Sequence, residues 1–272
     1  MTRKFLITAV AFACLITGQT LIAQKTIALS PRHEIFQRGL ELYEKQKYGA
    51  AREVFETVLN AEMSDGSMLV ADARYYLAMS ALKLYHSDAE FLVNEFISRH
   101  PENPRVNAVR FEMGKYYYTN KKYRDAIDWF AKVEKQKLAQ EDLHEYWFKY
   151  GYSWFMRNEL EKARFAFNEI KDIDTKYTSP ALYYYSHIAY HQQNYETALD
   201  GFNRLREDAT FAQVVPYYII QILYYQGKYD ELIAYAPGVI SQVSEKRLPE
   251  VSRLTGDAYY RKNMFSEAIP YL

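Results

Sequence analysis

Two histidines come nearer than any other residues to a chemical motif. His187 and His191 stand four positions apart in HIAYH, a spacing that places both rings on one face of a helix. Zinc proteases use this spacing with a glutamate directly after the first histidine and a further ligand elsewhere. Isoleucine follows His187 here, so the protease pattern fails. We interpret the pair as ordinary side chains of a helix face, without a metal.

The rest of the chain offers no catalytic constellation. No serine or cysteine lies in a nucleophile elbow, and no glycine-rich phosphate loop occurs. Glu141, Asp142, His144 and Glu145 gather at an expected helix start, where acidic side chains favour the helix dipole, so capping explains them. The 34 basic and 34 acidic residues are spread along the chain, and no basic stripe is available to neutralise phosphates. We therefore expect a protein without enzymatic activity, cofactor or nucleic-acid partner.

The histidines belong to a set of repeated helical elements, which is clearest in residues 144–175. Two short helices are expected there, joined by the polar turn Arg157-Asn158-Glu159. Apolar residues follow the helical period in both helices. They are Trp147, Tyr150, Gly151 and Trp154 in the first helix, and Leu160, Ala163, Phe167 and Ile170 in the second. The small Gly151 and Ala163 predict a close crossing of the two helices.

One small residue of the second helix sets the register of the repeats. It recurs at intervals of 38, 37, 37, 35, 34 and 36 residues, at Ala51, Ala89, Ala126, Ala163, Ala198, Leu232 (in place of alanine) and Ala268. A helical bundle without repeats would not need this recurrence. The sixth repeat matches least well, and its Ala236-Pro237-Gly238 predicts an interruption of the second helix.

This pattern resembles the tetratricopeptide repeat, a helical hairpin with a period of about 34 residues. The resemblance implies an all-α fold, a right-handed superhelical solenoid of antiparallel helix pairs. About seven repeats would cover residues 33–272. The last is incomplete, because it stops inside its second helix after the apolar Ile269 and Leu272. We therefore expect the natural protein to be longer.

The resemblance also implies a binding groove. In tetratricopeptide repeat proteins the first helices line a concave face that holds the partner. Carried over through the register, the groove residues proposed for partner binding are Phe111, Tyr118, Phe148, Tyr152, Phe155, Tyr183, His187, Tyr190, His191, Tyr217 and Tyr224. Such an aromatic, weakly charged groove suits other proteins or peptide segments, although about half of its tyrosines should only pack between repeats. A clamp for a terminal carboxylate is not expected, since only Lys115, Arg253 and Arg261 are basic there.

The first 23 residues are typical of an export signal. Arg3 and Lys4 precede an apolar run over residues 5–16, and Ala23 offers a cleavage site. Residues 24–32 would then form a flexible leader. Cys14, the single cysteine, is either an apolar residue of the signal or a lipid-modified anchor in a poorly matching context. We expect a periplasmic protein of a Gram-negative bacterium, with outer-membrane association as a further option.

These observations favour an exported scaffold that mediates protein–protein interactions, similar to the long signal-bearing repeat proteins of the periplasm. Envelope assembly or secretion would be its setting, and its partners could include a membrane-associated complex. Two alternatives stay open. One is a glycan-binding solenoid in which tyrosines stack on sugars, backed by Gln221 and Asp257. The other is a targeting arm for a functional domain beyond Leu272.

Overall fold

The computed structural model describes residues 31–60 and 68–272, and secondary structure in these residues is entirely helical. The helices are α1 (Pro31–Glu44), α2 (Tyr48–Asn60), α3 (Met68–Lys83), α4 (Ala89–Arg99), α5 (Val106–Thr119), α6 (Tyr123–Phe130), η1 (Lys135–Lys137), α7 (Gln140–Met156), α8 (Leu160–Asn168), α9 (Thr178–His191), α10 (Tyr195–Arg204), α11 (Val215–Tyr225), α12 (Tyr229–Val239), η2 (Ile240–Gln242), α13 (Leu248–Arg261), α14 (Phe265–Ala268) and η3 (Ile269–Tyr271). The expected signal, Cys14 and residues 24–30 of the expected leader lie outside these residues. Pro31 and Arg32, the last two residues of the expected leader, are already part of helix α1.

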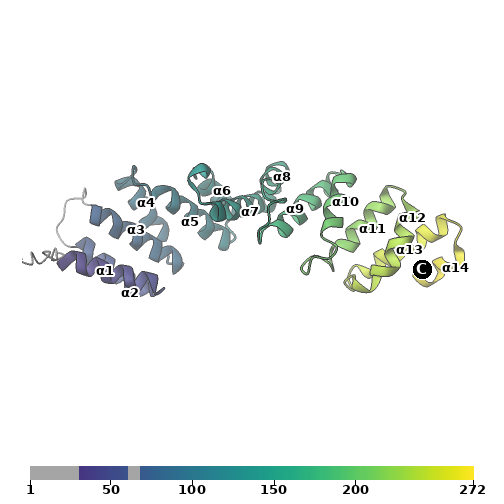
Figure 1. The fold of residues 1–272 in the computed structure, drawn as a ribbon, viewed down its shortest axis with the longest axis horizontal. Coiled ribbons are helices and arrows are strands. Elements are labelled where there is room, and N and C mark those ends of the chain that lie inside the picture. Colours follow the sequence, from purple (N-terminus) through teal and green to yellow (C-terminus); the bar gives the residue numbers. More distant parts are fainter. Residues whose placement is uncertain (1–30, 61–67) are drawn as a thin grey trace, which may run out of the picture.

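The helices form a row of hairpins. Each odd-numbered α-helix packs against the even-numbered helix that follows it, and the hairpins succeed one another from α1 and α2 at one end to α13 and α14 at the other (Figure 1). The molecule is accordingly elongated. Its architecture is the expected all-α solenoid.

All seven hairpins turn in the same way. One residue per turn has a positive φ, and these residues are Gln46, Tyr85, Lys121, Asn158, Gln193, Gly227 and Asn263. The residue after it donates its backbone N–H to the carbonyl five positions earlier, as from Lys47 to Leu42 (2.8 Å) and from Lys228 to Leu223 (2.9 Å). This bond and the left-handed residue are the Schellman ending of a helix. The turns count seven repeats in the described residues, independently of the side chains that predicted them.

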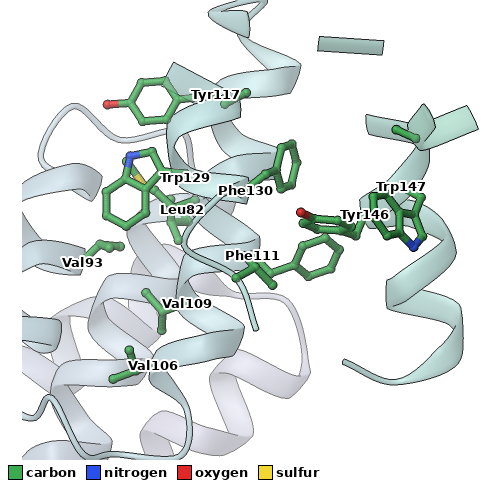
Figure 2. Close-up of a cluster of buried hydrophobic side chains, with 14 of the residues drawn as sticks. Leu82, Val93, Val106, Val109, Phe111, Tyr117, Trp129, Phe130, Tyr146 and Trp147 are labelled. Atoms are coloured by element: carbon green, nitrogen blue, oxygen red, sulfur yellow. The ribbon is translucent and has the colours of Figure 1, made fainter. Parts of the chain in front are cut away.

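A small residue of the first helix faces an aromatic ring of the second. A Cβ added to Gly39 would lie 2.6 Å from the Phe55 ring, and one added to Gly114 would lie 2.6 Å from the Phe130 ring. The glycines therefore make room for a fully buried phenylalanine rather than for a backbone crossing alone. Figure 2 shows Phe130 among the rings of one such layer.

The sixth repeat exchanges the sizes of this pair. Ile220 takes the small position on α11 and Ala236 takes the aromatic position on α12, and both are fully buried. The larger side chain of the pair thus lies on the first helix instead of the second. Hydrophobic cores tolerate such exchanges well when the total side-chain volume is kept.

The interruption predicted at Ala236-Pro237-Gly238 is wrong. Helix α12 continues through Pro237 to Val239. Proline cannot donate to the carbonyl four residues earlier, which belongs to Ile233. The Tyr259 hydroxyl of α13 lies 3.4 Å from that carbonyl oxygen and donates to it, so the neighbouring repeat supplies the missing hydrogen bond.

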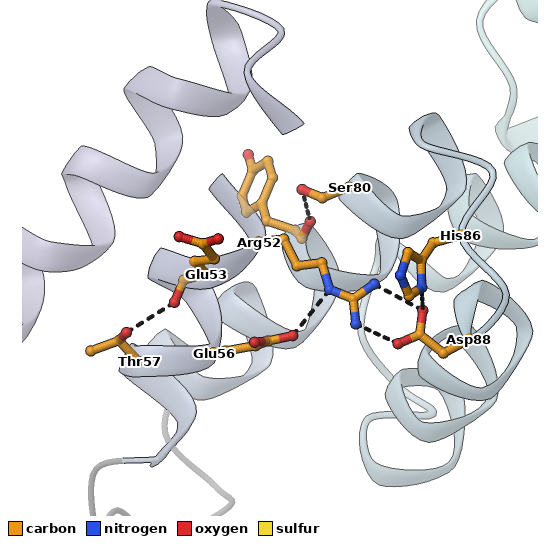
Figure 3. A network of polar contacts seen from close by, with 8 residues as sticks. Arg52, Glu53, Glu56, Thr57, Ser80, His86 and Asp88 are labelled. Carbon is orange, nitrogen blue, oxygen red and sulfur yellow. Dashed lines mark hydrogen bonds and ion pairs between the residues drawn. The ribbon is translucent and has the colours of Figure 1, made fainter. Parts of the chain in front are cut away.

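Polar contacts also join repeats. Arg52 on α2 donates from Nη1 to Oδ1 of Asp88 (2.9 Å), at the start of α4, and from Nε to Glu56 (3.0 Å) (Figure 3). His86 Nδ1 lies 2.7 Å from the same Asp88 oxygen. The Arg52 hydrogen bond, helped by His86, holds the pKa of Asp88 below its usual value. The first repeat is therefore tied to the turn of the second by a charged pair.

Candidate binding face on the first helices

Ten of the eleven predicted groove residues lie on a partly exposed side of the odd-numbered helices, which we call the first-helix face. Phe111 does not. Its side chain is 2% exposed and packs with Phe130 and Tyr146, at ring-centroid distances of 6.1 and 6.5 Å (Figure 2). The helical period placed Phe111 correctly on α5, but the Lys115 ammonium lies over its ring at 4.6 Å. Phe111 is therefore a core residue, and Lys115 takes its place at the surface.

Rings from α5, α7 and α9 meet in the middle of this face. Tyr118 lies 5.7 Å from Tyr152, and Phe155 lies 5.7 Å from His187. The link between them is Tyr184, which lies 5.3 Å from Tyr152 and 5.0 Å from Phe155. Sequence reasoning missed Tyr184. It belongs to a run of three tyrosines, and the helical period alone does not say which of them meets the neighbouring repeat.

Two further predicted residues pack at the edges of this aromatic section. Phe148 stacks on Tyr177, which precedes α9, at 5.2 Å. Tyr183 stacks on Phe211, in the connection before α11, at 4.7 Å. Both therefore fill the space between successive repeats, the packing role expected for a share of these aromatics.

The hydroxyl groups of this section remain protonated at ordinary pH. Burial raises the pKa of Tyr118, Tyr183, Tyr184 and Tyr190, with smaller contributions from neighbouring tyrosines. They can donate and accept hydrogen bonds but do not supply a phenolate. This chemistry suits recognition rather than nucleophilic catalysis.

The two histidines do meet. Their Nε2 atoms are 3.2 Å apart, and burial, with the nearby His191 and Arg247, lowers the pKa of His187 to about 4. His187 is therefore neutral at physiological pH, while His191 is exposed. In residues 31–60 and 68–272 no group of three His, Cys, Asp or Glu side chains gathers in a way that could hold a metal ion.

Charged residues form the N-terminal section of the face. Lys83 on α3 donates to Glu112 on α5 (3.0 Å), Lys115 lies 2.5 Å from Glu112 and 3.7 Å from Glu145 on α7, and Lys149 lies 2.9 Å from Glu145. Burial opposes ionisation of Glu112, but Lys115 and Lys83 outweigh it and keep its pKa below the usual value. These residues line a hollow of about 200 Å³.

Hydrogen bonds form the section at α9 and α11. The Tyr190 hydroxyl donates to Gln221 Oε1 (2.7 Å), and Gln221 Nε2 donates to Glu250 Oε1 on α13 (2.8 Å). Tyr217 donates to the other oxygen of Glu250 (2.9 Å). Gln221, only 3% exposed, is thus the centre of a network across three repeats.

The last section joins α11 to α13. The Tyr224 hydroxyl donates to Asp257 Oδ2 (2.5 Å), which also accepts from Arg261 Nε (2.6 Å). These two hydrogen bonds, Tyr224 first, hold the pKa of Asp257 below its usual value. The Asp257 carboxylate at this end of the face is therefore satisfied by a tyrosine and an arginine.

Comparison with known proteins agrees with this architecture. Residues 111–178 match the family model described as "Tetratricopeptide repeat". These residues therefore form tetratricopeptide repeats, and the hairpins before and after them continue the same architecture. No curated protein matches the sequence. Among solved structures, a tetratricopeptide repeat protein from Parabacteroides merdae is similar over 88% of this chain and 90% of its own, with 13% identity and a TM-score of 0.52. PilF from Pseudomonas aeruginosa is similar over 80% of this chain and 95% of its own, with 14% identity and a TM-score of 0.51.

At these identities the solved structures establish the fold alone. The kind of partner has to be inferred from the residues of this chain. Among the described helices, none is both long and apolar enough to cross a membrane. What the repeats of this chain share with others is a set of stacked hairpins. What differs is the pattern of side chains on the first-helix face.

Proposed function

We propose that this tetratricopeptide repeat protein is an exported, non-catalytic scaffold that binds other proteins along its first-helix face. One observation carries the proposal. Side chains on α3, α5, α7, α9, α11 and α13 join in a strip of ion pairs, aromatic rings and hydrogen bonds that crosses from repeat to repeat.

The strip favours a polypeptide segment as its occupant. Its donors and acceptors are fixed by contacts between repeats, so less side-chain entropy is lost on binding. Tyrosines offer broad contact area with one polar group each, which suits a chain that presents both apolar side chains and backbone amides. A segment lying across several repeats would meet charged, aromatic and hydrogen-bonding sections in turn.

The setting rests on the sequence. The signal-like residues 1–23 support export, and we place the protein in the periplasm, in envelope assembly or secretion, with outer-membrane association as an option. Intact-mass analysis of the protein expressed with its natural N-terminus tests this. A mature chain beginning at Gln24 in the periplasmic fraction is expected. An uncleaved chain in the cytoplasmic fraction would refute export.

Site-specific photo-crosslinking tests the binding face. A photoreactive residue replaces His191 or Arg253, both exposed on the first-helix face, or Phe91, which is 67% exposed on the second helix α4. Illumination of intact cells should give protein adducts at His191 and Arg253 but not at Phe91. Adducts at Phe91 with none at the other two positions would refute the first-helix face.

The glycan alternative gains no support from this geometry. Gln221 and Asp257, which would have to hold sugar hydroxyls, already bond to tyrosine and arginine side chains. A glycan site would depend on these two groups for its hydrogen bonds, whereas a polypeptide can also draw on apolar contact with the aromatic section. The targeting-arm alternative concerns residues beyond Leu272, and the same crosslinks would identify a partner for either arrangement.

A further inference from the structure

A second hollow lies away from the first-helix face. Its volume is about 450 Å³, and it is bounded by α7, α8 and the connection between α6 and α7. Trp147, Tyr150 and Trp154 supply the α7 wall. Because an α-helix turns about 100° per residue, these three rings lie on a different side of α7 from Phe148 and Tyr152. The hollow is therefore separate from the strip described above.

The hollow has an exposed apolar wall. Phe165 on α8 is 61% exposed, and its ring meets the Trp147 ring edge to face at 5.9 Å. Tyr150 and Trp154 make a similar contact at 5.8 Å. A large aromatic side chain left open to solvent beside other rings marks a binding surface more often than a lone exposed residue does.

Lysines surround these rings. The Lys135 ammonium lies 4.6 Å from the Trp147 centroid, and the Lys162 ammonium lies 4.2 Å from the Trp154 centroid. The connection over residues 131–139 carries three lysines and one glutamate, a net charge of +2. That glutamate, Glu134, is paired with Lys137 at 2.7 Å. Cations held on the rings thus give the mouth of the hollow a positive character.

The one acidic group in the wall is already satisfied. Glu161 accepts from Arg164 Nη2 (3.0 Å) and from Gln192 Nε2 (2.5 Å). Hydrogen bonding by these groups, Arg164 first, keeps the pKa of Glu161 below its usual value. Glu161 is therefore neutralised by Arg164. Lys162 is itself paired with Glu159 at 3.3 Å, so the excess positive charge of the mouth comes from Lys135 and the rest of the connection over residues 131–139.

We propose that this hollow is a second docking site, and that its occupant is an acidic peptide segment carrying one bulky apolar side chain. The apolar side chain would pack against Phe165 and Trp147, and flanking carboxylates would pair with Lys135 and Lys162. Opposite charges placed around an apolar contact steer association and fix its register. A sugar is disfavoured, because the lysines already occupy the Trp147 and Trp154 ring faces on which it would stack.

Fluorescence anisotropy with synthetic peptides tests the proposal. The probes are fluorescein-labelled nonapeptides with four acidic residues on each side of a central alanine, leucine, phenylalanine or tryptophan, and matched peptides with lysines in place of the acidic residues. The acidic peptides with large centres should bind at least about fivefold more tightly than their basic counterparts and than the alanine peptide. Equal binding of acidic and basic peptides, or no acidic peptide binding below 1 mM (an affinity of roughly −4 kcal/mol), overturns the proposal.

Variants at exposed positions test whether the peptides bind in the hollow. The double substitution Lys135→Glu with Lys162→Glu should reverse the preference for acidic peptides, and Phe165→Ala should remove the advantage of large centres. Phe91→Ala is the matched control, since Phe91 lies on α4 outside the hollow and is 67% exposed, close to the 61% of Phe165. Loss of binding in the control, or retention in both hollow variants, contradicts the assignment. Quenching of tryptophan fluorescence by chitohexaose that depends on Phe165 would replace the peptide with a glycan.

Discussion

Gly114 allows a sharp test of how each hairpin closes. It lies on α5, and a Cβ added to it would approach two atoms of the Phe130 ring to 2.6 Å. Ordinary contacts begin at 3.4 Å, so the ring would have to retreat by about 0.8 Å, the difference between the two distances. Three rings oppose that movement, with centroids 6.1, 5.6 and 6.1 Å from Phe130, namely Phe111, Tyr146 and Tyr150. Gly114→Ala therefore overpacks a closed layer.

The expected size follows from two opposing effects. Replacing glycine by alanine inside a helix stabilises by about 0.5–1 kcal/mol. Overpacking a well-filled core costs about 1–3 kcal/mol. The net effect for Gly114→Ala is a loss of about 1–2 kcal/mol in the free energy of unfolding, since Phe130 is fully buried and held on several sides.

A matched glycine separates the two effects. Gly49 lies in α2 with nothing within 4 Å of an added Cβ, so Gly49→Ala should be neutral or stabilising by up to about 1 kcal/mol. Urea unfolding followed by far-UV circular dichroism measures both variants. Adding Phe130→Leu to Gly114→Ala should cost less than adding it to the natural chain, because the smaller side chain relieves the overlap. Equal stability of the two alanine variants would refute the closed packing of Gly114.

Three further predictions concern charge and backbone. The depressed pKa of Asp88 means that its pairing with Arg52 stabilises above pH ~4 and fades as the pH falls through its folded value, so Asp88→Asn should lose about 1 kcal/mol at pH 7 and progressively less as the pH falls below ~4 in urea titrations. The pKa of His187 is lowered to about 4, so this residue leaves stability unchanged above pH ~6.5 and destabilises the fold as the pH falls from there to pH 4, where the unfolded chain takes up the proton first; after allowance for its partial exposure, the natural chain should lose about 1 kcal/mol more than His187→Phe between pH 7 and pH 5. Gly227 has φ +70°, so Gly227→Ala should destabilise by about 1 kcal/mol, and Gln193→Gly at the equivalent turn should stabilise by a similar amount in thermal unfolding.

The number and register of the repeats could be predicted because they depend on local packing. The buried alanines of the second helices, such as Ala51 and Ala163, recur at intervals within one residue of those between the seven turns. The turns themselves carry little signal. Their left-handed residues include Gln46, Tyr85 and Lys121, residue types that do not predict a positive φ. The Schellman hydrogen bond and the surrounding packing impose this conformation.

The binding face was predictable as a side of each helix but not in its contacts. Phe111 belongs to a first helix as predicted, but it is buried in the core beneath Lys115 and does not reach the face. The sequence offers Gln221 only as a group that could hold a sugar, whereas it bonds to Tyr190 from the preceding repeat and Glu250 from the next one. Such contacts depend on the offset between neighbouring hairpins, which no pattern within one repeat determines.

The state of the polar groups on the first-helix face bears on how a partner would be held. Glu112, Glu145 and Asp257 are already paired within the chain, so a partner must exchange existing bonds for new ones. Exchange of this kind yields little net free energy but penalises any partner that leaves a buried group unpaired. Under our proposal the polar sections thus select the partner and its register. Affinity would come mainly from apolar contact with the aromatic section, and from the hollow beside Phe165 if one partner reaches both sites, because a tethered second contact adds avidity without a new interface.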